Sequence, residues 1–296
     1  MTLTRWTRPL RHPGPVATER RTSVATSSTA ARVLLPAGLT LVDASAAALE
    51  QLGATSGQVE LLDGTLSRVS YCFPALCTDG ATAVTYSERH EAQVPARVAA
   101  GSATVGFRHG ERFAHCHATW FDAGGNLFGG HLWPETVIGP GGVHALVHAL
   151  DRVELISDTD PESRMPVFTP HEQPIRAVAA TGAVRAVMTR VAPGVELGEV
   201  VRDIMREHGF AKASIAGSLG SLSGAVLQRG GSVLVVDGPA TEVTLTGTFD
   251  LAAEADACPV SAMVIDRFGV VHHGLLVAEE NIVAVTLELL VEEVAS

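Results

Sequence analysis

Cysteine, aromatic residues and charged residues are all scarce in this chain of 296 residues. Its four cysteines, Cys72, Cys77, Cys116 and Cys258, do not form the dense framework of a disulfide-stabilised secreted domain. We therefore expect buried thiols in a reduced, cytoplasmic protein. The N-terminus lacks the apolar stretch of a secretory signal, and no run of about 18 apolar residues predicts a membrane span.

Positive charge is scarce as well. Lys and Arg total 21 against 32 Asp and Glu, and the resulting net charge of -11 disfavours nucleic-acid binding, because phosphate contacts need clustered positive charge. The exception is a basic arm over residues 1–24, which holds five arginines and a single glutamate. We expect this arm to pack on the body of the protein; an anion- or nucleic-acid-binding arm is the alternative.

Apolar residues and glycine are abundant, at 46% of the chain and 29 residues respectively, which predicts more than one core and many tight turns. The chain also contains a repeat, since a shift of 156 residues aligns Leu41 with Leu197 and Gly53 with Gly209. We therefore predict two related domains, over residues 25–157 and 183–296. A linker rich in proline and polar residues, 158–182, would join them.

Each copy of the repeat begins with a helical pattern. Apolar residues recur at helical spacing over 41–52 and 197–208, and a glycine ends each run. Strand-forming segments follow at 58–62 and 213–217. This order of elements predicts an α+β fold for both halves.

Two motifs resemble the plant-and-prokaryote conserved (PPC, or PCC) domain. They read GSLGSLSGAVL at 217–227 and HCHATWFDAGGNLFGGHL at 115–132, and the likeness extends over most of 30–294. The resemblance implies two tandem domains, each a bent, largely antiparallel sheet with a packed helix, and trimeric association. The His-x-His…Gly-Gly-His pattern also looks like that of α-acetolactate decarboxylase, in which three histidines hold zinc. Carried over, the ligands are His115, His117 and His131.

The spacing of these histidines supports a metal site independently. On a strand, His115 and His117 share a face, and a turn over 122–126 would place His131 opposite His117, about 5 Å away. Gly129 and Gly130 would leave room for a ligand. Three neutral imidazoles leave the fourth position of zinc open, as in catalytic sites. The alternative is three hydrogen-bonded histidines on a polar sheet face.

The second half departs from this pattern. Matching Asp266 to Asp122 places Pro259 and Ser261 where the first two histidines stand. With one residue deleted, Gly274 falls at the position of His131. The second domain is therefore predicted to be a degenerate copy without the metal ligands.

Three further residues are candidates for chemistry. Glu60, in an apolar strand, and Glu135, near His131, are candidate acid/base groups. Arg68 is a candidate anchor for a substrate carboxylate. The alternative for each is an exposed residue or a surface ion pair. His144 and His148 fall on a predicted strand and are expected to be structural.

Together these features predict a zinc-dependent hydrolase or lyase acting on a small carboxylate or carbonyl substrate, assembled as a trimer of two-domain chains. A non-catalytic ligand-binding or scaffold protein shares every one of these features. A DNA-associated regulator is a further alternative. The basic arm, however, lacks the Arg-Gly-Arg-Pro centre that accompanies the domain in such proteins.

Overall fold

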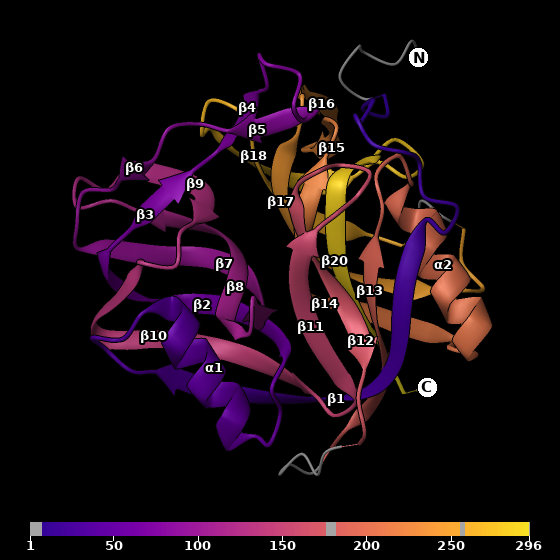
Figure 1. Cartoon of the computed structure of the whole chain (residues 1–296), viewed down its shortest axis with the longest axis horizontal. Helices are drawn as coiled ribbons and strands as arrows, with labels where there is room; N and C mark the ends of the chain where they lie inside the picture. The colour runs from indigo at the N-terminus through magenta and orange to yellow at the C-terminus, as the bar shows by residue number, and fades with distance from the viewer. Residues whose placement is uncertain (1–7, 176–181, 255–257, 296) are drawn as a thin grey trace.

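The computed structural model describes residues 8–175, 182–254 and 258–295. Figure 1 shows the two halves of the chain side by side, the first in indigo to magenta and the second in orange to yellow. The first half contains β1 (Arg21–Leu35), α1 (Leu41–Gln51), β2 (Gly57–Arg68), β3 (Ser70–Cys72), β4 (Pro74–Leu76), β5 (Val84–Tyr86), β6 (His90–Glu91), β7 (Ala96–Arg108), β8 (Glu111–Phe121), β9 (Leu127–Leu132) and β10 (Val137–Leu150). Between the halves lie β11 (Val153–Thr159) and β12 (Pro166–Glu172). The second half contains β13 (Val184–Val191), α2 (Leu197–His208), β14 (Lys212–Leu222), β15 (Ala225–Arg229), β16 (Ser232–Val236), β17 (Thr241–Asp250), β18 (Val260–Ile265), β19 (Val271–Leu276) and β20 (Val283–Glu293).

The predicted α+β class is wrong, because the fold is mostly β. The described residues form only two helices, α1 and α2, of 11 and 12 residues, against twenty strands. Both helices lie where the apolar periodicity predicts them. The helices form a smaller part of the fold than predicted. Each half has a single short helix, whereas nearly every other segment joins one large, largely antiparallel sheet.

The two halves share one strand order. In the first half, neighbouring strands run β1-β10-β2-β7-β8-β9, all antiparallel. In the second half, the order β13-β20-β14-β17-β18-β19 is its counterpart, with α2 following the first strand as α1 does. The repeat found in the sequence is therefore a repeat of topology.

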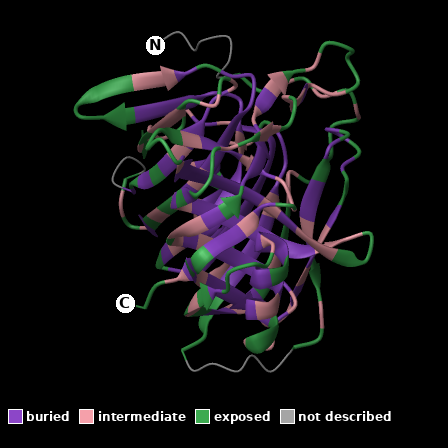
Figure 2. Cartoon of the chain, turned by 90° about the vertical axis from the view of Figure 1, so that its left-hand side faces the viewer, coloured by how far each residue is buried: buried purple, intermediate pink, exposed green. Residues whose placement is uncertain are grey.

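Strand β1 joins the halves into one sheet. Its residues 21–28 pair with β13, and its residues 28–35 pair with β10. Each half has its own apolar core, and a third cluster, which includes Leu155, Phe168, Met188 and Leu290, packs between them. Figure 2 shows this buried interior as continuous through the molecule. The relative position of the halves is therefore set by packing.

The segment predicted as a linker contains β12, which pairs with β11 along its length. Its residues 176–181 lie outside the described part of the chain. The part of the basic arm that the structure describes packs on the second half, as expected. His12 Nε2 lies 2.7 Å from the Ala284 carbonyl oxygen, and Arg20 pairs with the buried Glu162 at 2.6 Å. Arg5 of the arm lies outside the described residues.

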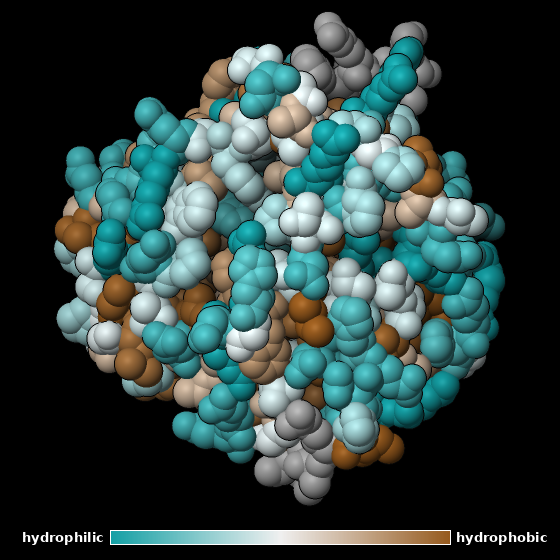
Figure 3. Space-filling view, viewed as in Figure 1, coloured by the Kyte–Doolittle hydropathy of each residue, from teal (hydrophilic) through white to brown (hydrophobic). Residues whose placement is uncertain are grey.

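No helix among the described residues is both long and apolar enough to cross a bilayer. On the face drawn in Figure 3, apolar residues are scattered among hydrophilic ones. All four cysteines are free, and three of them are buried.

Candidate metal centre

The three histidines lie on the β8–β9 hairpin, and the predicted pairing is observed. His117 stands directly opposite His131 across the two strands. Asp122 closes the turn by accepting a hydrogen bond from the Asn126 backbone N–H at 2.8 Å. A tight turn of five residues thus sets the register that brings the histidines together.

The two glycines before His131 serve packing, contrary to the prediction that they leave room for a ligand. A Cβ on Gly129 would lie 2.6 Å from Ile265, and one on Gly130 would lie 2.7 Å from the Cys72 carbonyl oxygen. Both distances are too short for any side chain. These glycines therefore let the hairpin approach β3 and the second half closely.

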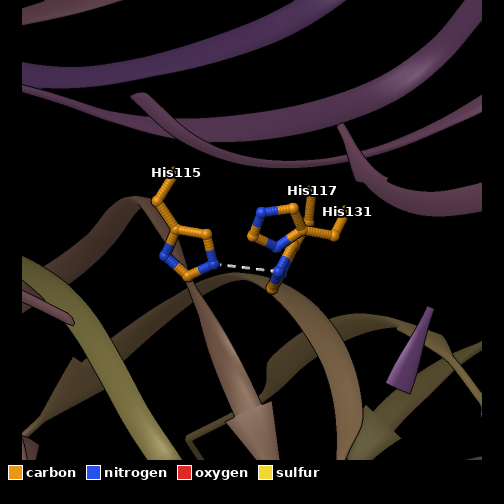
Figure 4. A group of neighbouring side chains, drawn as sticks. All are labelled: His115, His117 and His131. Carbon is orange, nitrogen blue, oxygen red and sulfur yellow. Dashed lines mark hydrogen bonds between the residues drawn. The ribbon is translucent and has the colours of Figure 1, made fainter. Parts of the chain in front are cut away.

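The three imidazoles converge (Figure 4). His115 Nε2 lies 3.0 Å from His117 Nε2, and one ring nitrogen of each histidine lies within 4.8 Å of the others. The side chain of His117 is 2% exposed, against 14% and 13% for His115 and His131. The group is therefore shielded but reachable from one side, and it could bind a metal ion.

The second half of the chain orients two of these rings. His115 Nδ1 lies 2.9 Å from both carboxylate oxygens of Glu288, and His117 Nδ1 lies 3.1 Å from the Val243 carbonyl oxygen. A carbonyl or carboxylate oxygen can only accept, so both Nδ1 atoms carry the proton. The two Nε2 atoms face each other 3.0 Å apart and remain as the candidate ligand atoms, so the residues present fit a bound metal.

Glu242, also from the second half, lies beside His117 and His131. Its Oε1 lies 4.0 Å from His117 Nε2 and 3.9 Å from His131 Nδ1, and its side chain is 3% exposed. Neither carboxylate oxygen has a hydrogen-bond partner among the described residues. Burial raises the pKa of Glu242 well above its usual range. An unpaired buried carboxyl group is costly, which indicates that a cation or a polar ligand completes it.

Burial also favours the neutral form of His117 and His131. It lowers the pKa of His117 well below the usual value, and the neighbouring His115 and His131 lower it further. Burial and then His115 lower the pKa of His131 in the same way. Neutral imidazole is the form that binds a metal ion.

A cavity of about 430 Å³ opens beside the histidines, between the two halves. Four of the residues lining it carry buried polar atoms that lack a hydrogen-bond partner in the described structure. They are His131, Trp133, Glu242 and Thr286. Buried polar groups are usually paired, so their concentration here identifies a site prepared for a ligand.

The other predicted site residues do not meet the histidines. Arg68 pairs with Glu91 at 3.3 Å, and Glu135 pairs with Arg89 at 3.2 Å, all of them well exposed. Glu60 Oε1 lies 3.0 Å from His148 Nε2. None of Arg68, Glu135 and Glu60 lines the cavity, so the structure does not support their predicted roles there.

Sequence analysis missed three residues of the cavity: Glu242, Glu288 and Arg108. For Glu288 a signal existed, since it interrupts the apolar run VAVTLELLV at 283–291. Glu242 and Arg108 carry no such signal. Both carboxylates were overlooked because the half that supplies them lacks the histidines.

The strand register of the second half corrects the alignment that the sequence predicted. The turns 122–126 and 266–270 have equal length, and Ile265 pairs with Val271 as Phe121 pairs with Leu127. No residue is deleted. Leu275, rather than Gly274, stands at the position of His131, and it pairs with Ser261 at the position of His117.

Several solved structures are similar to parts of this chain. A metal-containing protein from Archaeoglobus fulgidus and a PPC protein from Pyrococcus horikoshii each match at 16% identity and TM-score 0.37, covering 52% of this chain and 99% of their own. A protein from Ralstonia eutropha JMP134, provisionally described as DNA-binding, matches at 15% identity and TM-score 0.37, covering 46% of this chain and 88% of its own. Likeness this low does not establish a ligand or a partner for this chain.

No curated protein matches the sequence. The family model of the Plants and Prokaryotes Conserved (PCC) domain matches residues 178–295. That span covers the second half from before β13 to the end of β20, and it includes the GSLGSLSGAVL motif. The histidine triad lies outside it, in the first half, whose strand order is the same. The match to the Plants and Prokaryotes Conserved domain is thus confined to residues 178–295.

Proposed function

We propose that this protein is a zinc-dependent hydrolase or lyase acting on a small carboxylate or carbonyl compound. The observation that carries the proposal is the convergence of the ring nitrogens of His115, His117 and His131, next to the unpaired carboxyl group of Glu242. His115, His117 and His131 would hold the ion. Imidazole ligands favour zinc among the common divalent metals.

Zinc bound there would polarise a carbonyl oxygen or activate a water molecule. Within the chain, Glu242 replaces Glu60 and Glu135 as the acid/base candidate. It lies beside two of the histidines, inside the cavity, and burial favours its protonated form. A protonated carboxyl group there can deliver a proton to a ligand and take it back.

The test compares zinc-loaded wild type, His117→Ala and Glu242→Gln on small 2-oxo and 2-hydroxy acids and their esters, with products followed by NMR. We expect turnover by the wild type alone. If zinc-loaded wild type binds these compounds without turnover, the protein is a ligand-binding protein and the enzyme proposal is wrong. Turnover that survives in His117→Ala would remove the zinc-dependent mechanism.

Glu288 provides a second test, because it orients His115 from the other half of the chain. Replacement by glutamine keeps the size of the side chain but removes the charge that favours a proton on His115 Nδ1. We expect zinc affinity to fall about 10–100-fold, as for other partners of metal-binding histidines. Competition with a chromogenic chelator measures the affinity. Glu293→Gln, which alters an exposed pair with Arg185, is the matched control. Equal affinity in wild type and Glu288→Gln would contradict the orienting role.

We also retain three broader proposals. The domains are residues 25–157 and 183–296, with the arm 1–24 and the connecting segment 158–182. The shared strand order of the halves supports this division.

Four free cysteines support a cytoplasmic location. A trimer of two-domain chains is proposed from the family resemblance, and native mass spectrometry would test it.

A further inference from the structure

Arg108, at the end of β7, is a positively charged residue on the cavity wall with no ionic partner. It is the one Arg or Lys among the residues lining the cavity. Its guanidinium lies 5.3 Å from the centre of the Phe113 ring, which in turn stacks on Phe168 at 5.8 Å. Within the described residues it makes no ion pair, whereas Arg68, Arg89 and Arg112 each pair with a glutamate. The aromatic contact therefore holds the charge in place without neutralising it.

Glu242 and Glu288 lie beside the histidines, and Arg108 is a cationic side chain in the lining of the same cavity. Tyr86 also lines the cavity, with its ring centre 4.9 Å from that of His131. An anionic group in the cavity is attracted to Arg108, whose charge no carboxylate of the described residues neutralises.

Part of the cavity wall is apolar. Val84, Met165, Val167 and Val285 line the cavity and belong to one apolar cluster, with Tyr86 packed against it. At roughly 30 Å³ per water molecule, 430 Å³ holds about 14 waters, which exceeds the size of a two- or three-carbon acid. A ligand that fills the space therefore has an apolar body as well as polar ends.

We propose that Arg108 forms an anion subsite, and that the cavity selects monocarboxylates whose carboxylate pairs with Arg108 and whose apolar chain packs on the wall. The inference deepens the proposed function, since it names the substrate class of that cavity. Arginine suits this role because its planar fork binds a carboxylate through two hydrogen bonds. A carbonyl or hydroxyl oxygen of the ligand would then lie next to His115, His117 and His131.

The experiment measures binding by isothermal titration calorimetry, on zinc-loaded and on chelator-treated protein. The probes are 4-methyl-2-oxopentanoate, its neutral amide and pyruvate. The variants are Arg108→Met, which keeps the contact with Phe113, Arg108→Lys, and Arg68→Met as an exposed arginine control. Circular dichroism checks that each variant is folded.

We expect Arg108→Met to weaken binding of 4-methyl-2-oxopentanoate at least about tenfold, as for a lost charged hydrogen bond, and to leave the amide unchanged. Arg108→Lys should retain part of the affinity, and Arg68→Met all of it. Pyruvate should bind more weakly than the longer acid, by about fourfold for each methylene lost. Equal affinity of wild type and Arg108→Met for the acid, or no binding of the acid to either form of the protein, would overturn the proposal.

The two proposals can fail separately. Binding that depends on Arg108 in chelator-treated protein supports the subsite even if zinc-loaded protein shows no turnover. Turnover of acids with equal efficiency in wild type and Arg108→Met would support the enzyme and overturn the subsite.

Discussion

Protein purified without chelator is expected to contain close to one zinc ion per chain, and His117→Ala close to none. His117 is the most buried of the three histidines and faces both others, so its loss removes one of the three ligands and opens the centre of the site. Partners of a metal-binding histidine already change metal affinity 10–100-fold. We expect a larger loss when a ligand itself is removed. Elemental analysis of the purified protein gives the metal content.

His144→Ala is the matched control for this measurement, because His144 is an exposed histidine of the same half. It should retain the full metal content. Metal-free wild type, even after zinc is supplied, would contradict the proposed site. Equal metal content in wild type and His117→Ala would place the ion elsewhere in the chain.

His148→Ala is expected to destabilise the protein by about 3–5 kcal/mol, the usual cost of breaking a buried ion pair. His148 lies between two carboxylates, with Nδ1 2.9 Å from Glu292 and Nε2 3.0 Å from Glu60, and its side chain is 3% exposed. Glu292 belongs to the second half, so the cluster bridges the two halves. Without the imidazolium, two carboxylates are left close together with little water. Urea denaturation measures the free energy of unfolding.

The same cluster predicts a dependence of stability on pH. Burial lowers the pKa of His148, but Glu292 and Glu60 outweigh this effect and raise the pKa to about 9, against 6.5 for a free histidine. The stabilisation is therefore complete below pH 6.5 and is lost as the pH rises through 9, by about 3 kcal/mol. Burial raises the pKa of Glu292, but the hydrogen bond and charge of His148 outweigh this effect and lower it. The stabilisation that Glu292 contributes is therefore present above the usual pKa of a glutamate and is lost when the pH falls through the lowered pKa.

Denaturation at pH 6, 7.5 and 9 would show this effect as a fall in stability for wild type and for His144→Ala. The curve of His148→Ala should be flatter over the same range. A destabilisation below about 1 kcal/mol in His148→Ala, or parallel curves for the two histidine variants, would show that this cluster does not hold the halves together.

The amino-acid sequence was sufficient for features that depend on local pattern. The apolar periodicity located both helices, because helix formation follows spacing within a dozen residues. The turn at Asp122 to Asn126 predicted the pairing of His117 with His131, because a short hairpin loop fixes register. The internal repeat likewise predicted one strand order used twice.

Sequence pattern was insufficient for everything that depends on contacts between distant segments. The fold class was misjudged because two helical patterns stand out more than many short strands. The predicted roles of Arg68, Glu60 and Glu135 rested on residue type and local sequence. In the structure each of these residues forms an ion pair away from the three histidines.

What the sequence determined by itself is therefore the three-histidine hairpin and the duplicated architecture, since hairpin register and repeated order are encoded locally. Only the tertiary structure decided what faces the hairpin. Glu242 and Glu288 come from strands more than 100 residues away and reach the histidines because the second half packs against β8. Arg108 lines the cavity beside them because the same packing encloses the space between the halves.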